Sequence, residues 1–363
     1  MPPQVPNRPL SIQWIGDTKD LHGNAQLNRH ITKALSQMGH TVFVSRNEQN
    51  VGAEFTVHHD LMANFSNLGS PANPKTVAFR TWDFGPYPPR WVEKINKEYK
   101  QLWVYSDWIR HLALRGGVDA DKVHRIPLGI QSEIFQPSTS RPTPSGRRPF
   151  QFLFIGAAVQ RKGLDILLSA YQAAFSPQDN VTLVIKDLLN VPFYKNSYEH
   201  DAIRNFGGRP ENPELLYVDT FLEPVQLAEL IRSCHFGVYP YRAEGFAAPP
   251  LELMACGVPC ILPRFGPCLD YASDGNTIFV EYTDINIPIN KKFVYNSLGF
   301  EEFVTEVHFC EVKVADLAAK MRMAYEMNDG DYQALSKNAA KSAARFTWLN
   351  TAMEVTTCLS KIS

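Results

Sequence analysis

Hydrophobic and polar positions alternate along the first half of the chain in a strand-then-helix pattern. The apolar run LSIQWIG, residues 10–16, predicts a strand, and HTVFVS, residues 40–45, predicts the next one. Between them, apolar residues recur at helical spacing over residues 24–39, and Gly39 ends that helix. Further strands are expected in AEFTVHHD, KTVAFRTWDF, QLWVYS and VHRIPLG. This alternation favours a parallel sheet with crossover helices.

A second series of the same kind follows a segment that interrupts the pattern. Residues 136–149, QPSTSRPTPSGRRP, are rich in proline and contain no aliphatic side chain, which is typical of a linker. Strands and helices alternate again from FQFLFIG at residue 150 onward. At 363 residues the chain is too long for one ordinary core. We therefore predict an α/β protein of two doubly wound, Rossmann-like domains that face a central cleft.

The predicted boundaries follow from these changes of pattern. The N-terminal domain covers residues 1–136, the linker covers 137–149, and the C-terminal domain covers 150–335. Residues 282–312 lack clear periodicity and are interpreted as an insertion packed over the second domain, with a cover for the cleft as one role. Helices over residues 336–363 are expected to pack back toward the N-terminal domain.

The segment AEGFAAPPLELMACGVP, residues 243–259, carries two carboxylates eight positions apart, Glu244 and Glu252. A loop of small residues between them leads into a short helix that two prolines open and Gly257 closes. The free amides and partial positive charge at such a helix start suit a diphosphate. The glutamates can accept hydrogen bonds from neutral hydroxyls on either side. Together they predict a pocket for a nucleotide-diphosphate sugar, and the alternative is an ordinary loop–helix–strand unit with solvated glutamates.

Composition and charge argue against several other classes of protein. The formal net charge of −1 gives no reason to expect nucleic acid or an anionic membrane surface as a partner. The N-terminus does not resemble a signal peptide, and no stretch reaches the roughly 18 apolar residues of a membrane span. The six cysteines form no Cys-x-x-Cys pair. We expect reduced thiols in a cytoplasmic protein with at most peripheral membrane association.

These segments resemble the retaining glycosyltransferases of family 4, which have the GT-B fold. Residues 243–259 resemble the family's Glu-x7-Glu element, and FLFIGAAVQRKGLDILLSAYQAAF, residues 152–175, resembles its strand–loop–helix with a Lys-Gly pair. Residues 217–246 match the stretch before the glutamates, and residues 89–137 resemble the second half of the acceptor domain in a bacterial-type subset. The resemblance implies transfer of a hexose from a UDP- or GDP-linked sugar to an acceptor hydroxyl on a glycan, lipid-linked glycan, protein or small molecule.

The resemblance also implies roles for donor-binding residues. Lys162 would stabilise the leaving diphosphate, Glu252 would hold the ribose hydroxyls, and Glu244 would hold a hydroxyl of the transferred sugar. Such transfer needs no protein nucleophile, so stabilising charge on the phosphates is the main demand. For Lys162 the alternative is a solvated lysine before a helix. The other donor-binding candidates are Gly156, the backbone amides of Phe246, Ala247 and Ala248, the base-contacting stretch from Val218 to Phe221, and Gly23 with Asn24.

One position departs from the family pattern. Family members usually carry an arginine directly after the strand's glycine, whereas this chain has Ala157 after Gly156. Arg161 lies beside Lys162, and adjacent side chains point in different directions. The sequence therefore leaves open whether Arg161 supplies the second positive charge.

The acceptor site is expected in the first domain. RTWDFGPYPP, residues 80–89, follows a strand and is rich in aromatic residues and proline. Asp83 is the candidate for orienting the acceptor hydroxyl or taking its proton, with capping of the following turn as the alternative. Trp82 is the candidate sugar-stacking platform. His58 and His59, which end another strand, are further acceptor-binding candidates, and one ring should point to each face of the sheet if the strand persists.

Two other functions were compared with this one. A Rossmann dehydrogenase would need Gly-x-Gly-x-x-Gly after its first strand, which neither IGDTKDLHGN nor FIGAAVQRKG provides. A non-catalytic sugar-nucleotide-binding protein of the same fold would keep Glu252 and lose charge-handling residues, and Ala157 favours that reading.

Two Asp-x-Asp pairs imitate the metal signature of the other glycosyltransferase fold. Asp119 and Asp121 are expected in a turn, and Asp329 and Asp331 between helices. Neither place suits a cleft, so we expect no metal and no other cofactor besides the nucleotide sugar as co-substrate.

Overall fold

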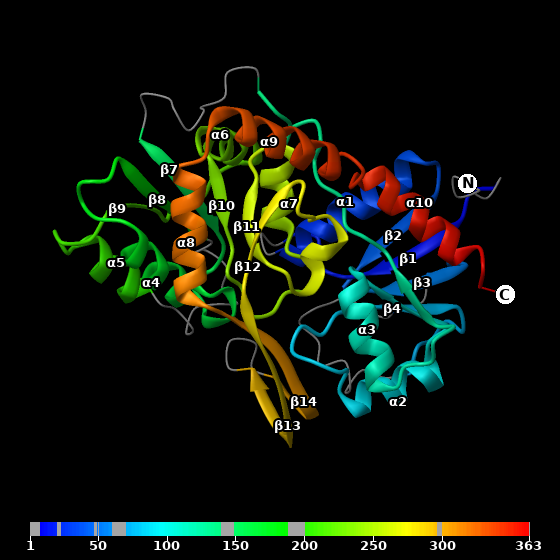
Figure 1. The fold of residues 1–363 in the computed structure, drawn as a ribbon. Coiled ribbons are helices and arrows are strands. Elements are labelled where there is room, and N and C mark those ends of the chain that lie inside the picture. The colour runs from blue at the N-terminus through cyan, green and yellow to red at the C-terminus, as the bar shows by residue number, and fades with distance from the viewer. Residues whose placement is uncertain are drawn as a thin grey trace. The chain divides into compact units, whose positions relative to one another are not determined.

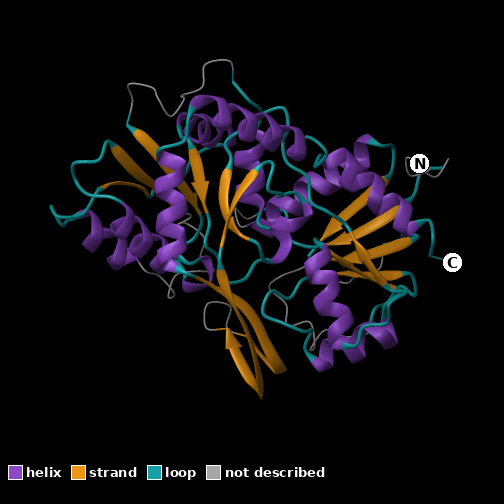
Figure 2. Cartoon of the chain, viewed as in Figure 1, coloured by secondary structure: helices purple, strands orange, loops and turns teal. Residues whose placement is uncertain are grey.

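The structure is a computed structural model that describes residues 8–19, 23–46, 49, 51–59, 70–138, 149–187, 200–295 and 300–362. The chain divides into two compact units (Figure 1). Unit 1 comprises Met1–Gly129, Asn286–His308 and Phe346–Ser363, and unit 2 comprises Ile130–Ile285 and Phe309–Arg345. Each contains a six-stranded sheet with helices packed around it (Figure 2), so the prediction of two Rossmann-like α/β domains is confirmed.

The sheet of unit 1 has the strand order β2-β1-β3-β4-β5-β6, and its strands pair in parallel. Because β2 and β3 flank β1 on opposite sides, the order reverses beside β1. The helix α10 packs against α1, with the rings of His30 and Trp348 stacked 5.0 Å apart. The elements of this unit are β1 (Ser11–Ile15), α1 (Gly23–Gln37), β2 (Thr41–Ser45), β3 (Phe55–His58), β4 (Thr76–Phe79), α2 (Pro89–Glu98), β5 (Gln101–Val104), α3 (Asp107–Gly116), β6 (Val123–Arg125) and α10 (Trp348–Leu359).

The sheet of unit 2 has the order β12-β11-β10-β7-β8-β9, again with parallel pairs. Here β8 and β10 flank β7, so the order reverses between β7 and β10. The elements are β7 (Phe150–Ile155), η2 (Gln160–Lys162), α4 (Leu164–Ala174), β8 (Val181–Lys186), α5 (His200–Gly207), β9 (Glu214–Val218), α6 (Pro224–Ser233), β10 (Phe236–Val238), α7 (Ala248–Ala255), β11 (Cys260–Pro263), η4 (Gly266–Asp270), β12 (Thr277–Val280), α8 (Val314–Tyr325) and α9 (Asp329–Ala343).

The segment interpreted as an irregular insertion over the second domain is a two-stranded sheet of β13 (Tyr282–Tyr295) and β14 (Phe300–Val312). Its middle part, Asn286–His308, groups with unit 1 rather than unit 2. Val304 is fully buried in the apolar core of unit 1, and His308 N donates to Phe84 O at 2.8 Å. The prediction that the insertion packs over the second domain is therefore wrong for this part.

The unit boundaries lie close to the pattern changes along the sequence. Unit 2 begins at Ile130, shortly before the predicted linker, most of which falls outside the described residues. Of the C-terminal helices, α9 belongs to unit 2 and α10 to unit 1.

Candidate active site

The loops that leave β7 and β10 lie where the strand order of unit 2 reverses. In open parallel sheets, ligands bind outside the carboxyl ends of the strands at this switch point. After β7 the chain passes through η2 into α4, and after β10 it passes into α7. The first loop carries Lys162 and the second carries Glu244, so the fold brings the two parts of the sequence motif to one place.

Glu244 is held by two cations from the loop after β7. Lys162 Nζ donates to Glu244 Oε1, and Arg161 Nη1 lies 3.3 Å from Oε2. Arg161 Nη1 also donates to Ala243 O at 2.7 Å. The whole Glu244 residue is 8 % exposed. Lys162, Arg161 and Glu244 therefore form one compact ionic cluster.

The cluster determines the protonation of Glu244. Burial disfavours the ionised carboxyl, but Lys162 and Arg161 outweigh this effect and lower its pKa below the usual value. Glu244 is therefore ionised at neutral pH. An ionised carboxylate only accepts hydrogen bonds, so it is suited to hold hydroxyl groups.

Gly163 allows the two loops to approach each other. It has a φ of 73°, ends η2 and precedes α4. A Cβ at this position would lie 2.0 Å from Pro240 O. The left-handed backbone and the close contact both require glycine. Gly163, the glycine of the Lys-Gly pair, thus allows the segment with Lys162 to pack against the segment that follows β10.

The start of α7 has an unusual backbone. Ala247 has φ 60° and ψ 60°, the only positive φ at a non-glycine residue in the described part of the chain. The Tyr271 hydroxyl donates to Ala247 O at 2.8 Å and holds this conformation. Strained backbone of this kind clusters at functional sites. The helix itself begins at Ala248, and Gly257 follows it with φ 74°, as the sequence predicts.

Glu252 lies on α7 and is partly buried. Burial raises the pKa of its carboxyl to about 8, and among the described residues no cation or donor contributes to the shift. The two glutamates of the motif thus occupy opposite environments. Glu244 is charged and paired, whereas Glu252 is largely neutral near pH 7.

The strand ends beside β8 carry two more predicted residues. Gly156 N donates to Lys186 O at 3.1 Å, and Val218 O accepts from Asp187 N at 3.0 Å. Gly156 and Val218 thus flank the end of β8. Ala157, at the position of the family's arginine, is buried with 1 % exposure. Since Arg161 contacts Ala243 and Glu244, its guanidinium sits against the same segment as Lys162.

Trp82 lies in the core of unit 1. It is 3 % exposed and packs edge-on against Phe84 and Trp91, with ring centroids 5.3 and 5.5 Å away. This burial corrects the expectation that Trp82 offers a ring face to an acceptor sugar.

The neighbour of Trp82, Asp83, is only partly buried. Burial raises the pKa of the Tyr87 and Tyr105 hydroxyls, and the negative charge of Asp83 raises both pKa values further. Asp83 therefore lies near both hydroxyls.

Both histidines that end β3 are buried inside unit 1. His58 Nδ1 lies 3.0 Å from the Tyr99 hydroxyl. His59 Nδ1 is hydrogen-bonded to Asn28 Oδ1, and its Nε2 lies 2.6 Å from the Tyr105 hydroxyl. Burial and the charge of Arg80 lower the pKa of His59 to about 3, so the ring is neutral. Both rings are covered by side chains of unit 1, so the structure does not support the expectation that these histidines contact the acceptor.

Two further residues at these sites, Asn28 and Arg242, were not predicted from the sequence. Asn28 on α1 accepts from Trp14 Nε1 at 2.7 Å and donates to Asp17 O at 2.8 Å, so it joins β1, α1 and His59. Arg242, two residues before Glu244, donates hydrogen bonds to Gln160 O and to the carboxylate of Asp165, which lie on either side of Lys162 in the sequence. Its place just before the motif is the only signal that could have indicated it.

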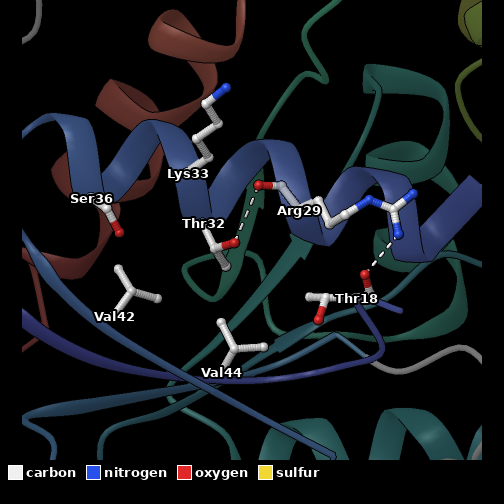
Figure 3. A pocket seen from close by; sticks show the side chains of 7 residues that line it. All are labelled: Thr18, Arg29, Thr32, Lys33, Ser36, Val42 and Val44. Carbon is white, nitrogen blue, oxygen red and sulfur yellow. Dashed lines mark hydrogen bonds between the residues drawn. The ribbon is translucent and has the colours of Figure 1, made fainter. Parts of the chain in front are cut away.

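The other candidate from unit 1, Gly23, forms the exposed start of α1. Further along α1 a groove runs between this helix and β2 (Figure 3). Arg29 reaches along it to donate to Thr18 O at 2.7 Å, and Val42 and Val44 form the facing side. None of the predicted site residues lines this groove.

Neither a metal-binding cluster nor a membrane-spanning helix occurs among the described residues. Within the described ranges, no group of three or more His, Cys, Asp or Glu side chains could hold a metal ion. Asp119 and Asp121 lie in a turn before β6, and Asp329 and Asp331 lie in the first turn of α9. None of the helices in the described part combines the length and hydropathy needed to cross a membrane. All six cysteines are buried thiols outside any disulfide.

The sequence of the second unit matches known proteins. Residues 136–286 match the family "Glycosyl transferases group 1". A D-inositol 3-phosphate glycosyltransferase of Paenarthrobacter aurescens is 29% identical over 44% of this chain and 40% of its own length. The MMP alpha-(1->4)-mannosyltransferase of Mycolicibacterium hassiacum is 27% identical over 58% of this chain and 48% of its own length. The chain thus spans less than half the length of these curated relatives.

Solved structures match the fold over nearly the whole chain. HepE of Anabaena, crystallised with UDP and glucose, matches this chain with a TM-score of 0.67 at 15% identity. The match covers 97% of this chain and 100% of the HepE chain. Sucrose-phosphate synthase of Thermosynechococcus elongatus has a TM-score of 0.68 at 15% identity, covering 96% and 98%. Residues 136–286 are therefore similar in sequence to group 1 glycosyltransferases, and the chain has the two-sheet α/β architecture of its GT-B structural neighbours.

Proposed function

We propose that this protein is a retaining glycosyltransferase that moves a hexose from a UDP- or GDP-linked sugar to an acceptor hydroxyl. The observation that carries the proposal is the pairing of Lys162 with Glu244 at the switch point of unit 2. A partly buried cation beside a left-handed turn and a helix start is an arrangement suited to a diphosphate. The sequence similarity of residues 136–286 to group 1 glycosyltransferases supports the same reading.

In this proposal Lys162 stabilises the charge that builds on the leaving diphosphate. The diphosphate takes over part of the contact that Lys162 makes with Glu244. Glu244 then accepts a hydrogen bond from a hydroxyl of the transferred sugar. Arg161 stays against Ala243 and adds a second positive charge to the cluster, in place of the arginine that is absent at Ala157.

Glu252 holds the ribose hydroxyls of the donor. Binding two hydroxyl donors favours the ionised carboxylate, so donor binding lowers the pKa of Glu252 from its raised value. The amides of Phe246, Ala247 and Ala248 line the sugar and phosphates, and the strand ends at Gly156 and Val218 bound the nucleotide. HepE has been crystallised with UDP and with UDP-glucose, which favours a UDP-sugar as the first donor to test.

Asp83 is the proposed residue for orienting the acceptor hydroxyl or taking its proton. His58 and His59 are assigned no acceptor contact, because their rings are buried and bonded to neighbours. We further propose that transfer needs no metal, since Lys162 and the start of α7 provide the positive charge, and that the protein works in the cytoplasm. Activity that survives a chelator is the expected result of a direct test.

The experiment that tests the function is a donor screen read by nucleotide release. UDP- and GDP-hexoses are incubated with the protein, with and without candidate acceptor sugars, and the released nucleoside diphosphate is measured. Calorimetry then compares two variants. Glu252→Ala should weaken donor binding more than Asp83→Ala, which should lower transfer instead. The reverse order would contradict the assigned roles.

A non-catalytic sugar-nucleotide-binding protein is the second candidate. The observation in its favour is the buried Ala157 at the position where the family carries a cation. It predicts tight donor binding with no nucleotide release under any acceptor. The donor screen therefore separates the two candidates.

A further inference from the structure

Arg242 lies on the loop that follows β10, and its guanidinium bonds entirely within the protein. Nε and Nη2 donate to the carboxylate of Glu311 at 2.6 and 2.7 Å. Nη1 and Nη2 donate to the carboxylate of Asp165, each at 2.8 Å, and Nη1 also donates to Gln160 O at 2.6 Å. An arginine side chain has five N–H donors, and these hydrogen bonds use all of them.

The partners of Arg242 come from segments that are distant in sequence. Gln160 opens η2, which carries Lys162, Asp165 lies in the first turn of α4, and Glu311 lies on β14. The backbone adds to these contacts, because Arg242 N donates to Arg161 O at 2.8 Å and Arg242 O accepts from Cys310 N at 3.0 Å. Residues 160–165 are thus fastened to the segment that carries Glu244 two positions later.

The ionic part of this arrangement is partly shielded from water. The Arg242 side chain is 12% exposed, and those of Asp165 and Glu311 are 43% and 42% exposed. Burial disfavours ionised Asp165, but its hydrogen bonds with Arg242 outweigh this effect and lower its pKa. A lysine could not make the same contacts, because an ammonium lacks the planar fork that bonds two carboxylates at once.

We propose that Arg242 is a positioning residue for glycosyl transfer: it sets the loop that carries Lys162 against the loop that carries Glu244. The inference rests on the glycosyltransferase function proposed above. Arg242 acts through these two residues rather than on substrate, since its donors are all engaged in the protein. Misplacement by about 1 Å in such a site can lower a rate about 100-fold.

The first test is steady-state kinetics of Arg242→Lys. We expect kcat to fall by about 10- to 100-fold, with a smaller change in the KM for the donor. In a Lys162→Ala background, the same substitution should lower kcat by less than about threefold, because the group that it positions is gone.

Arg322→Lys is the matched control in the same unit. Arg322 on α8 also makes several hydrogen bonds, to Asp179 Oδ1 at 2.9 Å and to Ala174 O, but contacts neither loop of the site. It should lower the melting temperature without changing kcat. A fall in kcat for both variants in proportion to their melting temperatures would overturn the positioning role.

Amide hydrogen exchange provides a readout that does not depend on turnover. Exchange over residues 160–165 and 243–247 should be faster in Arg242→Lys than in the wild type, and unchanged in Arg322→Lys. Unchanged exchange, or a kcat within about twofold of wild type, contradicts the inference. If the wild type turns over no donor, the proposed function fails, and exchange alone still decides whether Arg242 fixes the two loops.

Discussion

At the scale of single residues, the two glutamates of the motif differ in what surrounds their carboxyls. Burial affects both, but Glu244 has Lys162 and Arg161 beside it, whereas no cation in the described part of the chain shifts the pKa of Glu252. The pKa of Glu244 is therefore lowered, whereas that of Glu252 is raised to about 8. Titratable groups in one site whose pKa values are driven apart often divide the work of binding and charge stabilisation between them.

Glu252 makes stability depend on pH. Between its ordinary pKa of 4.5 and the folded value of about 8, the folded state binds a proton that the unfolded chain releases. The free energy of unfolding contributed by this group therefore falls as pH rises through that window. Glu252→Gln imitates the neutral carboxyl, so its advantage over the wild type should grow from pH 5 to pH 8.

Urea denaturation of both proteins across this pH range measures the effect. Glu229→Gln, on the exposed side of α6, makes the same chemical change at the surface and is the control. A constant difference between Glu252→Gln and the wild type would contradict the raised pKa.

Residue identity alone could not show which polar or aromatic side chains are buried. The places of Lys162 and Glu244 beside a glycine and of Glu252 on a helix follow from local sequence, and their roles stay predictions. The burial of Trp82, His58 and His59 could not be predicted. Their partners, among them Trp91, Asn28 and Tyr99, come from other parts of the chain.

At the scale of elements, the site depends on two loops that approach closely at one glycine. Gly163→Ala would meet Pro240 O and would also strain a backbone with φ 73°. Gly52 has the same φ, and no atom of the described residues lies within 4 Å of its Cβ position, so Gly52→Ala isolates the backbone effect. We expect a loss of stability of about 1–2 kcal/mol for Gly52→Ala and of about 3–5 kcal/mol for Gly163→Ala.

Thermal and chemical unfolding of the two variants checks this difference. Gly163→Ala should also lower donor turnover, since the loop with Lys162 must move away from Pro240. Equal losses of stability for both variants would show that the close contact with Pro240 O adds nothing to the cost of Gly163→Ala.

Elements near the site were predictable from local signals. The strand before Gly156, the proline start of α7 and its end at Gly257 all follow from short patterns of residues. The strands β13 and β14 were not predictable from local signals. Much of this segment groups with unit 1, whereas the sheet that precedes it in the sequence belongs to unit 2. Val304 instead completes an apolar core that also contains Trp82, Tyr87 and Trp91.

At the scale of the whole molecule, the chain returns to unit 1 twice after forming most of unit 2. One return supplies Val304, which is fully buried, while the adjacent Phe303 is 47% exposed. Val304→Ala should reduce the stability of unit 1 by about 1–3 kcal/mol through lost packing. Phe303→Ala, the larger truncation, should change stability by no more than about 0.5 kcal/mol.

Unfolding followed by tryptophan fluorescence distinguishes these outcomes, because Trp82 and Trp91 belong to the same core as Val304. If Phe303→Ala proved the more destabilising change, residues 300–308 would not contribute to unit 1 as described. The long separation in sequence explains why no local pattern indicated this contact.

The central claim is that Lys162 stabilises a leaving diphosphate, and one measurement tests it most directly. The rate of nucleoside diphosphate release is compared between the wild type, Lys162→Ala and Lys337→Ala, whose lysine is exposed on α9. The account predicts release by the wild type and by Lys337→Ala, and a kcat about 10²–10³ lower for Lys162→Ala. Equal rates in Lys162→Ala and the wild type, or donor binding without release by any of the three, would contradict it.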